Sequence, residues 1–268
     1  MTIRSLGYQT DLFFPRFDAE VTDRGDYMVV RTPSNPTYYW GNFLLFAHPP
    51  TESDFERWRT LFVDEIGSPP QVKHQAFGWD GMKGEVGELV AFFNAGFNLE
   101  DSIVLATKTV SRPEKYNEDV QIRPLTEDWE WDAVLENHVS CRDEIHSEAS
   151  YRSYSARQLA RYRAMSDAGL GCWFGGFLGG RLAADLGLFV SDGIGRFQQV
   201  GTHPDFRRRG ICGALVHQCS EYAFQRMGAE KLVIVADAHY HATGIYESVG
   251  FRAVERQMGI TWWNDGSE

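Results

Sequence analysis

At residues 199–215 the chain reads Gln199-Val200-Gly201-Thr202-His203-Pro204-Asp205-Phe206-Arg207-Arg208-Arg209-Gly210-Ile211-Cys212-Gly213-Ala214-Leu215. The segment before Pro204 is expected to be extended. After Gly210, apolar residues recur with the spacing of one helical face. The members of that face are Ile211, Ala214, Leu215, Cys219, Tyr222 and Ala223. The pattern therefore predicts a strand end, a basic turn and a helix that begins inside the turn.

The start of this helix has the chemistry of an anion site. The first amides of a helix have no partner within the helix and carry the positive end of its dipole. Gly210 and Gly213 allow close approach of the backbone, and three consecutive arginines supply guanidinium groups suited to phosphate oxygens. The alternative is a basic helix terminus without a ligand, but cations there oppose the helix dipole. We therefore expect the turn to bind a pyrophosphate.

The motif Arg207-x-x-Gly210-x-Cys212 resembles the Q/R-x-x-G-x-G/A signature of the GNAT superfamily of acyl-CoA-dependent N-acyltransferases. Cys212 departs from the signature, where glycine or alanine is usual, and narrows the space beside the phosphates. The resemblance implies acetyl-CoA as co-substrate and no metal. The residues then expected to contact acetyl-CoA are Val200, Gly201, Thr202, Arg207, Arg208, Arg209, Gly210, Ile211, Cys212, Gly213, Ala214, His239 and Tyr246.

A second motif, Tyr246-x-x-x-Gly250-Phe251, resembles the closing motif of the same family. In the family this tyrosine lies near the cofactor sulfur, so the resemblance implies that Tyr246 protonates the departing thiolate. The alternative is a core aromatic followed by a helix-capping glycine. His239 stands where the family often has asparagine. It is a cofactor contact, a proton carrier or an ordinary histidine at a strand end, and the sequence leaves all three open.

The sequence does not identify the base that deprotonates an amine acceptor. An alkyl amine with a pKa near about 10.4 is mostly protonated at neutral pH, so a base is needed. Asp185 lies in the apolar run Leu182–Leu188, and Asp237 lies at the end of a predicted strand. Burial can raise the pKa of a carboxyl and make it a base. Both aspartates are candidates for the base. Alternatively, each simply faces solvent, and a chain of water molecules takes the proton.

Composition narrows the class of protein. The 268 residues suffice for about two domains, and a formal net charge of −11 disfavours nucleic acid and favours a cationic amine. No apolar run approaches the roughly 18 residues that span a bilayer, and the first residues do not resemble a secretory signal, so we expect a cytoplasmic protein without membrane attachment. Four cysteines lack metal-site spacing and are expected to be free thiols: Cys141, Cys172, Cys212 and Cys219.

A polar stretch at 108–120 separates two periodic regions, so we expect domains at 1–115 and 116–268. The second domain is predicted to contain a strand at 120–124, a helix to about 138 that is capped by Thr126, and a helix at about 150–166. Strands are predicted at 172–178, 181–190 and 195–202. A hairpin turn is expected at Gly179-Gly180. A helix after 210, a strand at 231–236, a helix at 241–249 and final strands complete it. This order matches the α/β (α+β) GNAT fold, a mixed, mostly antiparallel sheet flanked by helices, over 118–264.

The first half of the chain repeats this layout. His48-Pro49 precedes a predicted helix as His203-Pro204 does, and Phe92-x-x-x-Gly96-Phe97 echoes the closing motif. The proline-to-phenylalanine distance is 48 residues in one copy and 47 in the other. Internal similarity at a fixed offset predicts a duplicated unit. The alternative is an unrelated α/β domain.

The copy of the basic turn falls at 52–58, which contains three acids and no glycine. Ser53 and Glu56 are expected to form a capping box, with Phe55, Trp58, Phe62 and Ile66 as a core stripe. Phe92 replaces the tyrosine and has no hydroxyl. The first half is thus expected to be a degenerate, catalytically silent GNAT-like domain. Its aromatic run at 38–40 either lines an acceptor cleft or packs internally.

These observations favour an acetyl-CoA-dependent N-acetyltransferase that acts on a primary amine of a small molecule or peptide by direct attack in a ternary complex. We expect the rate enhancement to come from holding the amine and the thioester as neighbours. Backbone donors at 200–202 are expected to polarise the thioester carbonyl. A CoA-binding sensor or scaffold without catalysis is the alternative. A further alternative is a transferase that uses another acyl-CoA or an aminoacyl-tRNA. Either a monomer or a homodimer is expected.

Overall fold

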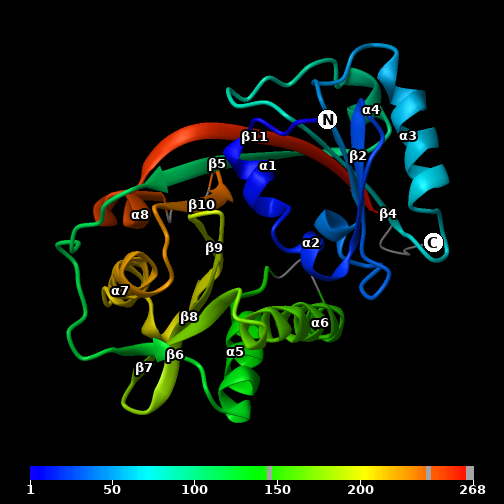
Figure 1. Cartoon of the computed structure of the whole chain (residues 1–268). Coiled ribbons are helices and arrows are strands. Elements are labelled where there is room, and N and C mark those ends of the chain that lie inside the picture. The colour runs from blue at the N-terminus through cyan, green and yellow to red at the C-terminus, as the bar shows by residue number, and fades with distance from the viewer. Residues whose placement is uncertain (144–146, 240–242, 264–268) are drawn as a thin grey trace. The chain divides into compact units, whose positions relative to one another are not determined.

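The computed structural model describes residues 1–143, 147–239 and 243–263 (Figure 1). They form two compact units. Unit 1 comprises Met1–Val104, Ala236–His239 and the described residues from Val254 onward, and unit 2 comprises Leu105–Val235 and the described part of 240–253. Three strands have residues in both units: β5 (Asn98–Thr107), β10 (Lys231–Asp237) and β11 (Arg252–Trp263). The domain boundary expected between residues 115 and 116 stays a prediction.

In unit 1 the strands follow the spatial order β1-β2-β3-β4-β11-β5. The β3–β4 pair is parallel, whereas the β1–β2, β2–β3 and β4–β11 pairs are antiparallel. The other strands are β1 (Glu20–Asp23), β2 (Tyr27–Arg31), β3 (Phe43–Phe46) and β4 (His74–Trp79). The helices are α1 (Leu6–Asp11), α2 (Pro15–Asp18), η1 (Tyr39–Gly41), α3 (Asp54–Glu65) and α4 (Val90–Asn94).

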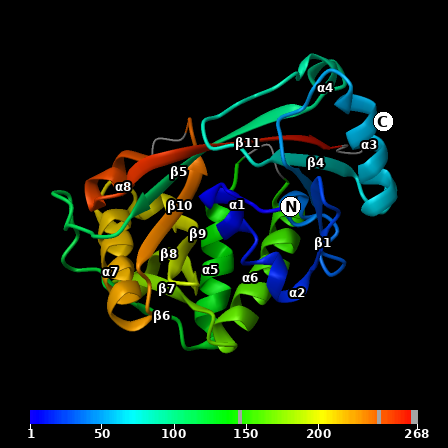
Figure 2. The same ribbon diagram turned by 45° about the horizontal axis from the view of Figure 1, so that its top comes forward.

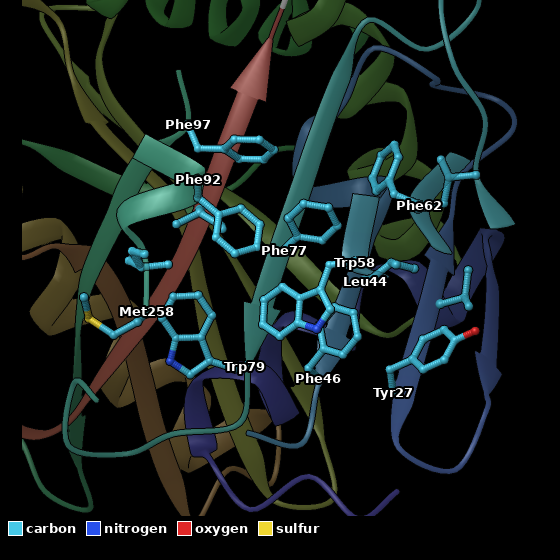
Figure 3. Close-up of a cluster of buried hydrophobic side chains, with 14 of the residues drawn as sticks. Tyr27, Leu44, Phe46, Trp58, Phe62, Phe77, Trp79, Phe92, Phe97 and Met258 are labelled. Carbon is cyan, nitrogen blue, oxygen red and sulfur yellow. The ribbon is translucent and has the colours of Figure 1, made fainter. Parts of the chain in front are cut away.

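An aromatic core fills the space between α3, α4 and the strands of unit 1 (Figure 3). Trp58 of α3 stacks on Phe46 of β3 with ring centroids 3.8 Å apart and planes 3° from parallel. Phe92 is fully buried among these rings. The core stripe predicted for α3 is confirmed, since Trp58, Phe62 and Ile66 are buried. Large aromatic side chains supply most of the apolar area that stabilises such a unit.

The capping box predicted at the start of α3 is wrong. Ser53 has helical dihedrals and its side chain caps nothing. Asp54 instead accepts hydrogen bonds from the amide and hydroxyl of Thr51, at 2.8 and 2.7 Å. The aromatic run at 38–40 packs internally, because Tyr39 lies against His74 and Trp40 lies against Phe43.

In unit 2 the strand order is β10-β9-β8-β7-β6. The β6–β7, β7–β8 and β8–β9 pairs are antiparallel and β9–β10 is parallel. Helix α7 lies on one face of these strands, and α5 and α6 lie side by side on the other (Figures 1 and 2). The strands are β6 (Gln121–Pro124), β7 (Gly171–Leu178), β8 (Arg181–Ser191) and β9 (Ile194–Thr202). The helices are α5 (Asp128–Cys141), α6 (Glu148–Asp167), η2 (Pro204–Phe206), α7 (Ile211–Arg226) and α8 (Thr243–Val249).

The element order predicted for the second half is confirmed from β6 to α8, but one described strand, β11, follows α8 where more than one was predicted. Residues 241 and 242 of the helix predicted at 241–249 lie outside the described residues. The mixed, mostly antiparallel sheet is also confirmed. Gly179 and Gly180 both have positive φ, 59° and 79°, which is the geometry of a tight hairpin turn. The cap of α5 differs from the prediction by one residue. Glu127 rather than Thr126 is the N-cap, and it forms a capping box with Glu130.

Unit 1 repeats the central motif of unit 2. In each unit a strand, a helix and a second strand form a parallel crossover, β3-α3-β4 in one and β9-α7-β10 in the other. A short helix and a glycine with positive φ follow each crossover, Gly96 at 85° and Gly250 at 115°. No described helix has the length and apolar character to span a bilayer.

Candidate functional site

Helix α7 begins with amide groups that donate to nothing in the described part of the chain. Its N-cap is Gly210, with φ 77° and ψ 6° in the left-handed region. The N–H groups of Ile211, Cys212 and Gly213 form the first turn, and the first intrahelical bond of the helix runs from Ala214 N to Gly210 O at 3.1 Å. Three unpaired donors thus lie at the positive end of a 16-residue helix, where the helix dipole favours negative charge.

The three arginines before this turn are exposed, and no described carboxylate lies within ion-pair distance of them. Arg207 donates through Nε to Thr202 O at 3.1 Å. Arg208 has a positive φ of 61°. The Arg209 guanidinium carbon lies 5.5 Å from the centre of the Phe206 ring. Guanidinium groups without a described carboxylate partner therefore add positive charge around the unpaired amides at the start of α7.

The two glycines of the turn are packed against the chain itself. A Cβ on Gly210 would lie 3.0 Å from Lys115 O, and one on Gly213 would lie 3.1 Å from Pro113 Cγ. Asn117 also donates through Nδ2 to Arg209 O at 3.0 Å. The absence of a side chain at Gly210 and Gly213 therefore allows residues 113–117 to pack closely, and it allows the left-handed conformation of Gly210. The amides of the first turn have no described acceptor and could donate to a ligand.

Strand β9 leaves its neighbour β10 part-way along its length. The described β9–β10 ladder ends at the pair Arg196–Val233, whereas β9 continues to Thr202. Gln199 has a positive φ of 48°, and the register with β8 shifts between Asp185 and Gly187. Such an irregularity re-aims the backbone. Val200, Gly201 and Thr202, all half-buried, thus lie on a stretch of edge that β10 does not pair with.

Tyr246 lies in α8 and is 5% exposed. Its carbonyl accepts from Phe251 N at 3.1 Å, across the turn made by Gly250. This fixes the end of α8. The role of its hydroxyl as proton donor stays a prediction.

Two other predicted site residues lie at the end of β10, Asp237, and just after it, His239, and both are grouped with unit 1. Asp237 is exposed, and its Oδ1 accepts from His239 N at 2.7 Å. The His239 side chain is 79% exposed, with Nε2 3.4 Å from Asp101 Oδ2. Asp101 in turn forms a bidentate pair with Arg256, which lowers the pKa of its carboxyl.

Asp185 is fully buried on β8 and accepts hydrogen bonds from three side chains. Its Oδ2 accepts from Asn137 Nδ2 at 2.5 Å, and its Oδ1 accepts from Trp173 Nε1 at 3.0 Å. The second contact to Oδ1 is His138 Nε2 at 2.9 Å. We call these four residues the Asp185 cluster. Burial of a carboxylate is tolerated only when donors satisfy it, and this cluster supplies them.

Residues 131–251 match the model of the Acetyltransferase (GNAT) family. Residues 131–251 are a GNAT acetyltransferase domain. This range contains the basic turn, β9, α7 and Tyr246, so the domain is that of an acyltransferase. The chain has no significant match among curated proteins.

Solved structures show the same fold at low identity. A functionally unknown conserved protein from Staphylococcus epidermidis matches with TM-score 0.69 and 15% identity, over 92% of this chain and 95% of that one. A GCN5-related N-acetyltransferase from Kribbella flavida matches with TM-score 0.65 and 13% identity, over 96% and 95%. A tandem GNAT protein from the clavulanic acid biosynthesis pathway matches with TM-score 0.52 and 13% identity, over 94% and 85%. Each of these likenesses in fold extends over more than nine-tenths of this chain, and so beyond residues 131–251.

The sequence analysis missed the partners of Asp185 within the GNAT domain. Asn137 and His138 lie near the end of a helix that was predicted, but no local pattern links them to Asp185, which is 48 and 47 positions away. The one available signal was the acid itself, because a carboxylate inside an apolar strand requires buried donors.

The four cysteines are free thiols in the structure. Burial raises the pKa of Cys212 to about 11, so this residue of the GNAT turn stays protonated near neutral pH. Within the described ranges, no group of three or more His, Cys, Asp or Glu side chains is arranged to hold a metal ion.

Proposed function

We propose that this protein is an acetyl-CoA-dependent N-acetyltransferase that acylates a primary amine of a small molecule or peptide. The observation that carries the proposal is the pairing of two features within unit 2. The first turn of α7 has unpaired amides, and β9, the strand that leads into that turn, has an edge that β10 does not pair with. The first turn of α7 can hold the diphosphate of acetyl-CoA, while the edge of β9 lies within reach of the acyl group attached to the same molecule.

The diphosphate of acetyl-CoA fits the donors of the turn. Amides of Ile211, Cys212 and Gly213 supply hydrogen bonds, and the exposed arginines supply charge. A doubly charged group at such a position gains both from the helix dipole and from charge-assisted hydrogen bonds. Cys212 stands where the GNAT signature has glycine or alanine. It is compatible with a bound diphosphate, because its thiol is neutral.

The thioester is then expected beside Val200–Thr202. Backbone donors there would stabilise the charge that develops on the carbonyl oxygen during attack. Holding amine and thioester as neighbours removes much of the entropic barrier. Tyr246 would protonate the thiolate as it leaves, a step that typically contributes about 10²-fold or more.

The acceptor is proposed to be a cationic amine, because the net charge of −11 raises the local concentration of cations around the protein. On the same ground we propose no nucleic-acid partner. A cytoplasmic location and a monomer or homodimer are part of the proposal. Unit 1 is proposed to be catalytically silent, since the first turn of α3 is acidic and Phe92 is sealed in the core.

Thermal denaturation with and without acetyl-CoA tests the proposal first, followed by release of free thiol with a panel of amines. Stabilisation together with amine-dependent thiol release is expected. Stabilisation without turnover for any amine would favour the sensor or scaffold alternative. Absence of stabilisation at millimolar acetyl-CoA would refute cofactor binding.

A further inference from the structure

The Asp185 cluster is built to hold a histidine in one tautomer. Asp185 is fully enclosed, and both of its oxygens already accept hydrogen bonds, so the carboxylate itself has no face left for a substrate. An ionised carboxylate accepts only, so the His138 nitrogen that contacts it, Nε2, must carry the proton. The other nitrogen, Nδ1, is then a bare acceptor, and it has no partner among the described residues.

Three contacts bring this end of α5 to the open edge of β9. Asp185 is the cross-strand neighbour of Gly201. The Asn137 amide nitrogen lies 3.6 Å from the position of a Cβ on Gly201. One turn further along α5, Cys141 donates through Sγ to Thr202 O at 3.4 Å. The histidine therefore lies on the helix that packs against the stretch proposed to bind the thioester.

We propose that His138 is the proton acceptor for the incoming amine and that Asp185 is its positioning residue, an inference that rests on the proposed N-acyltransferase function. His138 Nδ1 takes one proton from the ammonium group. The neutral amine attacks the thioester carbon, a C–N bond forms, and the C–S bond breaks. Tyr246 protonates the thiolate that leaves. The nitrogen loses a second proton, which restores the hydroxyl of Tyr246. The products are the amide, the free thiol of CoA and one proton, which leaves from His138 to water.

Asp185 contributes in a second way, because its negative charge stabilises the imidazolium that forms. A neutral imidazole held by a carboxylate is a recurrent arrangement for a general base. It also explains why an acid is placed inside an apolar strand, where it costs stability unless it serves a partner. The proton acceptor is thus His138 rather than either carboxylate, Asp185 or Asp237.

The other charged and titratable groups around His138 do not compete for the proton near neutral pH. Cys141 of α5 and Tyr151 of α6 are both half-buried, and partial burial raises the pKa of each above its ordinary value, so both stay protonated. Arg207 lies beside Cys141, and a guanidinium group has no acceptor for a proton. Imidazole is the side chain that changes charge near neutrality.

The tautomer can be measured on the unaltered protein. Two-bond ¹⁵N–¹H correlation spectra of ¹⁵N-histidine-labelled enzyme distinguish protonated from bare ring nitrogens, and His138→Gln assigns the signal. The inference predicts a protonated Nε2 and a bare Nδ1 at pH 8. A protonated Nδ1 on His138 would overturn it.

Kinetics separate a catalytic role from a structural one. The rate constant kcat/KM of His138→Gln and Asp185→Asn is measured from pH 6 to 10 with the most active alkyl amine of the panel. At pH 7 we expect a loss of about 10²-fold for His138→Gln. The loss should shrink toward pH 10, where the amine is largely neutral without help.

The matched control is His217→Gln, which removes a buried histidine from α7, on the other face of the sheet. Its pH profile should equal that of the unaltered protein. Stabilisation by acetyl-CoA should be unchanged in all three variants. If the unaltered protein transfers acetyl groups and His138→Gln loses activity equally at every pH, His138 is structural and the inference fails while the proposed function stands.

Discussion

The carbonyl oxygen of Lys115 lies 3.0 Å from the position that a Cβ would take on Gly210. Gly210 also has a φ of 77°, which other residues adopt only with strain. The same residue caps α7, so three demands meet at one position: a left-handed backbone, close approach of residues 113–117 and a helix start that presents free amides.

Gly210→Ala is expected to lower the free energy of unfolding by about 2 kcal/mol or more, since a dihedral cost of about 1–2 kcal/mol adds to a steric one. It should also weaken acetyl-CoA binding, because relief of the contact moves the first turn of α7. Urea denaturation and isothermal titration calorimetry measure the two effects.

Gly228→Ala is the matched control. Gly228 has a φ of 70°, and nothing lies within 4 Å of its would-be Cβ, so only the dihedral cost applies. If both variants lose the same stability, residues 113–117 do not constrain the turn.

Removal of the Arg207 side chain is expected to weaken acetyl-CoA binding about tenfold, because a charge-assisted hydrogen bond contributes about 1.5–3 kcal/mol. The Arg207 Nε also donates to Thr202 O, so the substitution should lower the free energy of unfolding slightly. The binding loss should shrink as salt is raised, since salt screens exposed charges. Arg226→Ala, at the other end of α7, should change neither quantity, and a salt-independent loss for Arg207→Ala would argue against phosphate contact.

Tyr246→Phe is expected to lower kcat by about 10²-fold while leaving the Kd for acetyl-CoA near its original value. The substitution keeps the buried ring and deletes only the hydroxyl, so the fold of α8 should persist. Stopped-flow turnover and calorimetry separate the two constants. Tyr222→Phe on the exposed side of α7 serves as control. Unchanged kcat for Tyr246→Phe would remove the proton-donor role.

The stability of the protein should fall as the pH is lowered from about 6.5 to 4 because of His74. Burial lowers the pKa of His74 from 6.5 to about 4, although its Nε2 donates to Asn42 O at 3.0 Å. Between these values the unfolded chain binds a proton that the folded protein does not. The loss approaches about 1.4 kcal/mol per pH unit within this window.

Urea denaturation of unit 1, followed by the fluorescence of its buried tryptophans, measures this pH dependence. His74→Gln should flatten the curve above pH 4. Below that, carboxyl groups with lowered pKa, such as Asp80 and Glu65, lose their own contribution in both proteins. An equally steep curve for the variant between pH 6.5 and 4 would contradict the prediction.

Local patterns predicted much of this fold. The Gly179-Gly180 turn, the start of α7 at Gly210 and the order of elements in the second half follow from residues adjacent in sequence. Two local predictions were wrong in detail. Ser53 takes helical dihedrals and leaves its capping role unused, and Glu127 caps α5 in place of Thr126.

Contacts between distant residues set the limit of the sequence analysis. Nothing adjacent to Asp185 indicates that Asn137, His138 and Trp173 will surround it, because α5 meets β8 only in the folded unit. The packing of residues 113–117 on Gly210 is likewise a tertiary contact. The basic turn was predictable because its chemistry is contained in one continuous segment.

The structure of the protein bound to acetyl-CoA tests the central claim most directly. The diphosphate oxygens are expected to accept hydrogen bonds from at least two of the amides of Ile211, Cys212 and Gly213, at about 2.7–3.2 Å. A diphosphate bound away from the start of α7, with those amides still unpaired or covered by residues 113–117, would contradict it.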